Sequence, residues 1–209
     1  MKHLEELIER HPPLSACASE IEAAFRALSE CYASGGKLMV CGNGGSAADA
    51  DHIVGELMKG YLKARPLPED LRVRLRAADS ALGPALAECL QGALPAVNLT
   101  AGSALLSAFG NDVRSELAYA QAALGHAKKG DVLLGISTSG NAANVRSALV
   151  VGRAVGMTTI GLTGRGGGKM AGLCDVLIAV PAARTFEIQE LHLPVYHCLC
   201  AMVEERFFT

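Results

Sequence analysis

The sequence predicts an α/β protein, in which helices cover both faces of a central parallel sheet to give a three-layer α/β/α sandwich. Three observations predict this fold class. Segments that suit strands alternate along the chain with segments that suit helices. The strand segments are runs of Val, Ile and Leu without polar alternation, which is typical of strands buried on both faces of a parallel sheet. In residues 14–33 the apolar side chains recur at three- and four-residue spacing, which predicts an amphipathic helix.

The predicted elements follow one another without an internal repeat or a low-complexity stretch. Pro12-Pro13 ends the first helix, and Gly35-Gly36 ends the second. The predicted helices are 3–11, 14–33, 47–59, 102–109, 113–127, 142–155, 169–173 and 185–208. The predicted strands are 37–41, 95–100, 131–136, 157–162 and 175–180.

The chain divides into an amino-terminal helical arm and one domain. We expect residues 1–34 to be helices that pack on the domain or on a neighbouring subunit, and residues 35–209 to form the domain. Residues 62–94 are the hardest to assign, because two prolines open the segment and Gly83-Pro84 interrupts its second helical pattern.

Composition restricts the classes of function. The 209 residues are 50% hydrophobic and 19% charged, which excludes disorder. The formal net charge of −2 offers no basic surplus for nucleic acid. Seven cysteines without a CxxC pair indicate reduced, buried thiols. No apolar stretch approaches the ~18 residues of a membrane span, and the charged amino terminus is unlike a signal peptide. We therefore expect a cytoplasmic protein with no nucleic-acid or membrane partner.

Two strand-to-helix loops share a composition that suits an anion. GNGGS (42–46) follows the first predicted strand, and STSGN (137–141) follows the third. Glycines let backbone N–H groups approach a phosphate, hydroxyls add donors, and the helix N-terminus adds partial positive charge. The alternative is that these residues only cap helices and turn the chain. Neither loop has the Walker A or GxGxxG pattern, so we expect a small phosphorylated ligand and no nucleotide cofactor.

Four polar side chains on two helices form a second candidate site. His52 and Glu56 are four residues apart and share a helix face, and Gln189 and His197 are eight apart on the last helix. One interpretation is that His52 and Glu56 form a surface ion pair and that the histidines of the last helix are core or interface residues. The spacing also suits a divalent metal site or the acid and base of a proton transfer.

Five segments, in this order, resemble the sugar isomerase (SIS) family. They are CGNGGSAADADHIVGEL, the pair Asn111-Asp112, GDVLLGISTSGNAANV, LTGRGGGKMAGLCDV and IQELHLPVYHCL. The similarity extends over nearly the whole chain from about residue 14 and is strongest to the phosphoheptose isomerase branch. It implies a flavodoxin-like SIS domain and a homotetramer with active sites at subunit boundaries. Compared with that family, residues 62–94 look like an insertion.

The resemblance implies roles for particular residues. Glu56 and His197 match the catalytic acid/base pair. The substrate-binding residues it implies are Asn43, Gly44, Gly45, Ser46, Glu56, Asn111, Asp112, Ser137, Thr138, Ser139 and Gln189. The metal-binding residues it implies are His52, Glu56, Gln189 and His197. The family's STSGNS motif usually ends in a substrate-binding serine, and Ala142 stands here in its place.

The implied activity is aldose–ketose isomerisation of sedoheptulose 7-phosphate to D-glycero-D-manno-heptose 7-phosphate through an enediol. The resemblance implies Zn²⁺ as the cofactor, and we expect it to be weakly bound, because a carboxylate cannot hold a metal tightly and also act as a free base. Two alternatives remain. One is a non-catalytic SIS tetramer similar to the replication-initiator-associating protein. The other is an isomerase for a different phosphosugar, with Ala142 and the insertion setting its specificity.

Overall fold

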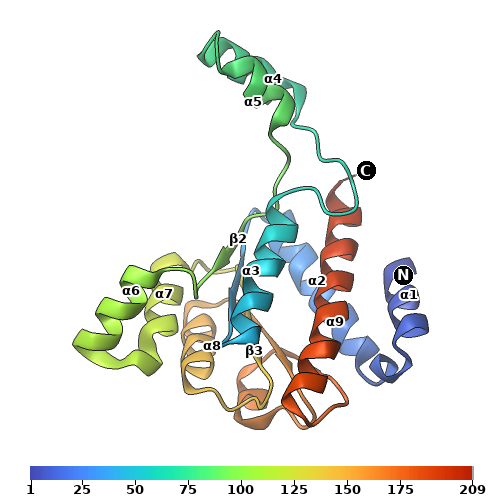
Figure 1. Ribbon diagram of the computed structural model, residues 1–209, viewed down its shortest axis with the longest axis vertical. Helices are drawn as coiled ribbons and strands as arrows, with labels where there is room; N and C mark the ends of the chain where they lie inside the picture. Colours follow the sequence, from blue (N-terminus) through green and yellow to red (C-terminus); the bar gives the residue numbers. More distant parts are fainter. Residues whose placement is uncertain (209) are drawn as a thin grey trace.

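The computed structural model describes residues 1–208, which contain one five-stranded sheet. Its strands are β1 (Leu38–Cys41), β2 (Ala96–Asn98), β3 (Val132–Ser137), β4 (Thr158–Thr163) and β5 (Val176–Ala179). Neighbouring strands are parallel, and their order across the sheet is β2-β1-β3-β4-β5. That order defines a flavodoxin-like doubly wound fold. The predicted fold class is therefore confirmed (Figure 1).

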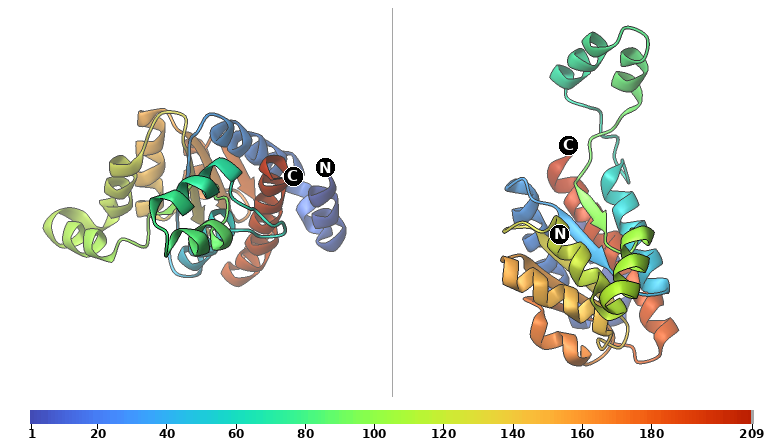
Figure 2. Two further views of the ribbon diagram at one scale, coloured as in Figure 1. Left: turned by 90° about the horizontal axis from the view of Figure 1, so that it is seen from above. Right: turned by 90° about the vertical axis from the view of Figure 1, so that its left-hand side faces the viewer.

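Helices form a layer on each side of the sheet, as the three views show (Figures 1 and 2). The first layer contains α2 (Ala18–Ala33), α3 (Gly45–Met58) and α9 (Thr185–Phe207), with α1 (Lys2–Arg10) packed against α9. The second layer contains α7 (Ala118–His126) and α8 (Ala143–Val155), with α6 (Ser103–Phe109) beside α7. The amino-terminal helices thus lie on the domain of their own chain.

The strands have apolar side chains on both faces because each face contacts a helical layer. In β1, Leu38 and Val40 pack with α2, α3 and α9, whereas Met39 and Cys41 pack with α7 and α8. Successive side chains of a strand point to opposite faces, so a strand between two layers needs an apolar residue at every position. This is the physical reason for the unbroken apolar runs in the sequence.

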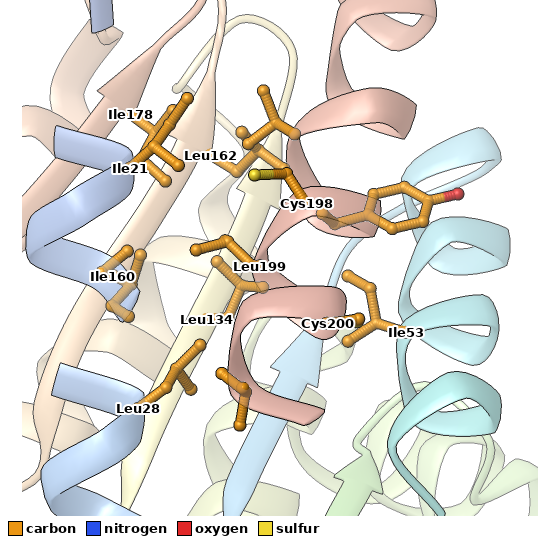
Figure 3. Close-up of a cluster of buried hydrophobic side chains, with 14 of the residues drawn as sticks. Ile21, Leu28, Ile53, Leu134, Ile160, Leu162, Ile178, Cys198, Leu199 and Cys200 are labelled. Carbon is orange, nitrogen blue, oxygen red and sulfur yellow. The ribbon is translucent and has the colours of Figure 1, made fainter. Parts of the chain in front are cut away.

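The last helix lies in the middle of its layer, between α2 and α3. Cys198, Leu199 and Cys200 are all buried, and they lie among side chains of α2, α3 and the sheet (Figure 3). Because neighbours surround α9 on several sides, consecutive residues can all be apolar. This packing also fixes the position of His197, which precedes the buried run.

Three predicted helices differ in detail from the structure. The helix predicted over 14–33 begins as a 3₁₀ segment, η1 (Pro12–Cys17), before α2. Prolines lack the N–H that an α-helical turn requires, which accounts for the tighter start. The helix predicted over 113–127 contains a π-helical turn, η2 (Gly110–Arg114), a 3₁₀ turn, η3 (Ser115–Leu117), and then α7. A short 3₁₀ segment, η4 (Gly168–Leu173), stands where 169–173 was expected to be helical.

Residues 62–94 form a helical hairpin that projects from the body of the domain (Figure 1). Its helices are α4 (Glu69–Ala78), which buries none of its side chains, and α5 (Gly83–Cys89). Arg72 and Arg76 pair with Glu88 of α5 and with Glu69 of their own helix. These exposed ion pairs, together with the packing of α4 on α5, hold the hairpin together.

The cysteines lie mainly in the interior, as expected. Cys89 is exposed and Cys174 is partly buried; the other five are buried, and no two of the seven form a disulfide. Burial raises the pKa of the Cys17 thiol to about 11 and that of Cys41 to about 12, so both stay protonated. No helix in residues 1–208 combines the length and apolar character needed to cross a bilayer.

Candidate active site

Two loops follow the carboxyl ends of β1 and β3, which are neighbouring strands in the sheet. Loop 42–46 joins β1 to α3, and loop 137–141 joins β3 to α8. Because α3 and α8 cover opposite faces, the loops diverge and leave a crevice at the carboxyl ends of the strands. The crevice is a cavity of about 380 Å³. Among the residues that line it are Asn43, Gly44, Gly45, Ser46, Ser137, Thr138, Ser139 and Gln189.

The second loop carries hydroxyl groups into this cavity. Ser137 and Thr138 line the cavity, so a ligand bound there can use their hydroxyls. Ser139 Oγ accepts a hydrogen bond of 3.2 Å from the backbone N–H of Asn141. Ala142 lines the same cavity and adds no donor. These groups, beside the start of α8, suit the oxygens of a phosphate monoester.

Gln189 lies directly against the first loop. A Cβ atom on Gly45 would lie 2.3 Å from Gln189 Nε2, so only glycine allows this approach. Gly44, the residue before α3, has a φ of +54°, which also favours glycine. Gly45 thus leaves room for the amide of Gln189, and Gly44 allows the turn of the backbone that precedes α3.

Asn43 connects the first loop to the start of α8 through hydrogen bonds. Its Nδ2 donates to Asn144 Oδ1 at 2.9 Å, and Asn144 Nδ2 donates back to Asn43 Oδ1 at 2.8 Å. The hydroxyl of Tyr119 donates to the carbonyl oxygen of Gly42 at 2.9 Å and lies 3.2 Å from Asn43 Oδ1. Because its amide group is engaged in this way, Asn43 holds the first loop against the start of α8. Sequence reasoning missed Asn144 and Tyr119, since nothing local pairs residues 101 positions apart.

The glycine-rich loop 164–168 supports the second loop from behind. Gly140 has a φ of +65°, and a Cβ atom there would lie 1.9 Å from the carbonyl oxygen of Gly167. The side-chain oxygen of Asn141 accepts a hydrogen bond from the backbone N–H of Lys169 at 3.0 Å. The position of Ser137, Thr138 and Ser139 therefore depends on close backbone contact between the two loops.

We predict that Gly140→Ala impairs phosphate binding. The substitution combines an unfavourable φ with a clash against backbone, so the loop must shift, at a cost of about 1–3 kcal/mol in stability. Inorganic phosphate should inhibit the variant at least about tenfold more weakly than wild type, which corresponds to about 1.4 kcal/mol of binding. Gly172→Ala is the matched control, because a Cβ atom there meets nothing within 4 Å. Unchanged phosphate inhibition of Gly140→Ala would contradict this role of the loop.

The second candidate site assembles between α3 and α9. His52 Nε2 lies 3.2 Å from Glu56 Oε1 and 3.4 Å from His197 Nε2. The His52 and His197 rings meet edge to face, with centroids 4.9 Å apart. The packing of α3 against α9 thus brings His52 and Glu56 close to His197.

Three further side chains surround this cluster, and sequence reasoning missed them. The Tyr196 hydroxyl lies 3.0 Å from His52 Nδ1 and donates to Asp49 Oδ1 at 3.3 Å, which orients the imidazole of His52. Lys59 Nζ donates to the other carboxylate oxygen of Glu56 at 3.1 Å. A tyrosine adjacent to His197 and a lysine three residues after Glu56 are visible in the sequence. The roles of this tyrosine and this lysine cannot be inferred from the sequence, because they depend on how the helices pack.

Burial controls the electrostatics of the cluster. It lowers the pKa of His197 below the usual value for histidine, and the neighbouring His52 lowers it further. Burial raises the pKa of Asp49, against the opposing effects of the Tyr196 hydrogen bond and His52. His197 is therefore mainly a neutral imidazole near pH 7, with one N–H to donate and one lone pair to accept.

The four predicted metal-binding residues do not all meet at one point. Gln189 and His197 are eight residues apart on α9, which is about 12 Å along a helix axis. Gln189 contacts the first loop, whereas His52, Glu56 and His197 lie together farther along the two helices. Within residues 1–208, no three His, Cys, Asp or Glu side chains are already arranged as a complete metal site.

Asn111 and Asp112 lie apart from both sites within one chain. They are exposed on η2, between α6 and α7, and Asn111 Nδ2 donates to Asp112 Oδ1 at 2.9 Å. Neither lines the cavity between the two loops. Of the predicted substrate-binding residues, this pair alone lies neither beside the cavity nor in the His52 cluster.

The chain also matches a known domain family. The family model of the SIS domain matches residues 5–82 and 82–164, which is more than half of the chain. The chain is therefore a member of the SIS domain family, as the sequence motifs predicted.

Proteins named phosphoheptose isomerase are similar to this chain over most of their length. The one from Rhodospirillum rubrum is 40% identical over 92% of this chain and 88% of the relative. The one from Aneurinibacillus thermoaerophilus is 38% identical over 90% of this chain and 82% of the relative. Phosphoheptose isomerase GmhA from Neisseria gonorrhoeae has a similar structure, with a TM-score of 0.75 and 32% identity over 98% of this chain and 96% of that one.

Proposed function

We propose that this protein interconverts sedoheptulose 7-phosphate and D-glycero-D-manno-heptose 7-phosphate through an enediol. Relatives named phosphoheptose isomerase cover most of the chain and bear out the expectation of a phosphosugar isomerase. The structural observation that carries the proposal is the cluster of His52, Glu56 and His197 beside a separate loop site for phosphate.

The spacing of the two sites supports a long sugar phosphate. The helices α3 and α9 run side by side in the same direction, with Gly45 beside Gln189 and His52 beside His197. Gly45 and His52 are about 10 Å apart along the axis of α3. The seven bonds from phosphorus to C2 of a heptulose 7-phosphate span about 8 Å at about 1.2 Å per bond. A triose phosphate, with three such bonds, would span about 4 Å and would not reach both sites.

We assign Glu56 as the group that moves the proton between the two reacting carbons. As base, its carboxylate removes a proton from C1 of the open-chain ketose, and the C1–C2 enediol forms as the C2 oxygen gains a proton. Return of the proton from Glu56 to C2, with loss of the proton on the C1 oxygen, gives the aldose. Lys59, bound to the outer carboxylate oxygen, orients Glu56.

We assign His197 as the group that exchanges protons with the substrate oxygens. Its lowered pKa keeps the imidazole neutral, so it can donate to the C2 oxygen and accept from the C1 hydroxyl. Meanwhile, Ser137, Thr138 and Ser139 hold the phosphate and fix the orientation on which the rate depends.

We further propose that His52, Glu56 and His197 hold a weakly bound Zn²⁺. Two imidazoles and a carboxylate are ligands that zinc prefers, and donors around tetrahedral zinc lie about 3.3–3.4 Å apart. The His52–Glu56 and His52–His197 distances of 3.2 and 3.4 Å are close to that value. Bound zinc would polarise the substrate carbonyl and stabilise negative charge on the enediolate oxygen.

We also propose that the protein works as a homotetramer in the cytoplasm, with active sites at subunit boundaries. The position of Asn111 and Asp112 supports this, because they are exposed and far from the loops of their own chain. Phe109, Leu117, Leu124 and Val150 line an apolar groove beside them. A neighbouring chain that packs there would bury this groove and bring Asn111 and Asp112 to a phosphosugar. Free thiols are consistent with a reducing compartment.

The deciding experiment supplies sedoheptulose 7-phosphate to the purified protein and looks for an aldoheptose 7-phosphate. We expect turnover that a chelator reduces and that added zinc restores. Turnover unaffected by the chelator would reject the zinc site but not the isomerase. Absence of turnover with and without zinc would reject the enzyme and favour the non-catalytic SIS protein. Turnover of another ketose phosphate alone would favour the isomerase of different specificity.

A further inference from the structure

A buried ion pair, which the mechanism above does not use, lies at the far end of α3 and α9. Arg65 Nε donates to Glu204 Oε1 at 2.8 Å, and the two side chains are 0% and 1% exposed. Removing two charges from water is costly unless their remaining hydrogen bonds are also satisfied. The partners of each side chain therefore indicate what the pair holds in place.

Glu204 fixes the chain that leaves α3. Its two carboxylate oxygens accept hydrogen bonds from the backbone N–H groups of Tyr61, Leu62 and Lys63, at 2.8, 2.7 and 3.1 Å. Burial alone would raise the pKa of Glu204, but these N–H groups and Arg65 outweigh it and keep the carboxylate ionised. One residue of α9 thus holds three consecutive residues beyond α3, including Tyr61, whose ring centroid lies 5.8 Å from that of His197.

Arg65 fixes the last turn of α3 itself. Its Nη1 donates to the carbonyl oxygen of Leu57 at 2.7 Å, and its Nη2 donates to that of Glu56 at 3.1 Å. Carbonyl groups in the last turn of a helix lack helical partners, so a guanidinium is well suited to them. Its guanidinium carbon also lies 4.6 Å from the centre of the Phe208 ring. The backbone of the proposed base is therefore bonded directly to Arg65.

Glu204 is on the same face of α9 as His197. The two residues are seven apart, which is nearly two full turns and about 10 Å along the axis. Arg65 and Glu204 therefore connect the backbone of Glu56 on one helix to the helix that carries His197.

We infer that the Arg65–Glu204 pair is a clamp that sets the distance between Glu56 and His197. Arg65 and Glu204 are therefore positioning residues for the isomerisation. This inference rests on the proposed function. Neither side chain reaches the substrate. Each acts through the backbone to which it is bonded. A small displacement of Glu56 relative to His197 is enough to slow the reaction, because misplacing a catalytic group by about 1 Å can cost about 10²-fold in rate.

Asp131, directly before β3, provides a matched control outside the contact between α3 and α9. Its carboxylate is also buried, accepts hydrogen bonds from the backbone N–H groups of Lys37 and Lys128, and pairs with the Lys37 ammonium. Asp131→Asn and Glu204→Gln therefore remove equivalent charges from equivalent environments. Only the second change lies between the helices that carry Glu56 and His197.

The test measures kcat, KM, inhibition by inorganic phosphate and thermal unfolding for wild type, Glu204→Gln, Arg65→Lys and Asp131→Asn. We expect Glu204→Gln to lower kcat by about 10²-fold while phosphate inhibition stays within about twofold, because the phosphate loops lie at the other end of α3. Arg65→Lys keeps the charge and should retain more activity than Glu204→Gln. The control should unfold at a lower temperature than wild type, with kcat nearly unchanged.

Several outcomes would overturn the clamp. If wild type is active and the kcat of Glu204→Gln equals that of Asp131→Asn, the Arg65–Glu204 pair has only a structural role. A loss of kcat that comes with an equal loss of phosphate inhibition would indicate general loosening instead. If Glu204→Gln does not fold, the comparison of Arg65→Lys with Asp131→Asn decides between these outcomes. An inactive wild type would instead reject the proposed function, so the two failures are distinguishable.

Discussion

Glu56→Gln should reduce turnover by at least about 10³-fold, because the amide cannot accept the proton that the carboxylate removes from carbon. The substitution preserves the size and shape of the side chain and leaves the phosphate loops untouched. Inhibition by inorganic phosphate should therefore remain within about twofold of wild type, as is expected when only a transition-state interaction is lost. Steady-state kinetics and phosphate inhibition of the purified variant check both expectations.

Asp51→Asn is the matched control for Glu56→Gln. Asp51 is a carboxylate on the same helix, one residue before His52, but it is exposed and accepts a hydrogen bond from Asn98 Nδ2 at 2.6 Å. The same change of charge there should leave kcat nearly unaltered. If Glu56→Gln keeps more than about a tenth of wild-type kcat, Glu56 is not the base, since general base catalysis contributes about 10²–10⁴-fold.

His197→Ala should remove both the zinc and the activity. The imidazole is at once a proposed zinc ligand and the group that exchanges protons with the substrate oxygens, so both functions depend on one side chain. We expect kcat to fall by at least about 10²-fold and the zinc content to fall well below that of wild type. Elemental analysis after dialysis against buffer with trace zinc measures the metal independently of the rate.

His126→Ala controls for loss of a histidine as such. His126 is exposed and lies in the last turn of α7, on the other side of the sheet. It should keep both zinc and activity. Wild-type zinc content in His197→Ala would contradict the ligand assignment, whereas wild-type turnover in that variant would contradict the catalytic one.

Local patterns were sufficient to predict the candidate site in outline. Loops 42–46 and 137–141 could be located because glycines and hydroxyls follow apolar runs. His52 and Glu56 could be paired because a spacing of four residues puts two side chains on one helix face. Pairing these residues with His197 required the resemblance to the SIS family, since no periodicity relates residues 145 positions apart.

Residues whose roles arise from packing escaped sequence reasoning. Asn144 was indistinguishable from any polar residue near a helix start, and its bond to Asn43 depends on the adjacency of β1 and β3. Charged residues usually lie at the surface, and no local pattern marks Arg65 and Glu204 as exceptions. They are buried because the chain that leaves α3 crosses the end of α9.

By itself, the sequence determined the class of fold and the chemistry available to it. Unbroken apolar runs require a sheet covered on both faces, and glycine-hydroxyl loops at strand ends supply donors for an anion. These are local properties, since each depends on a few neighbouring residues. The tertiary structure alone decided the strand order, the meeting of His52, Glu56 and His197, and the burial of Arg65 against Glu204. Those features depend on contacts between residues far apart in the chain, which form only when the helices pack on the sheet.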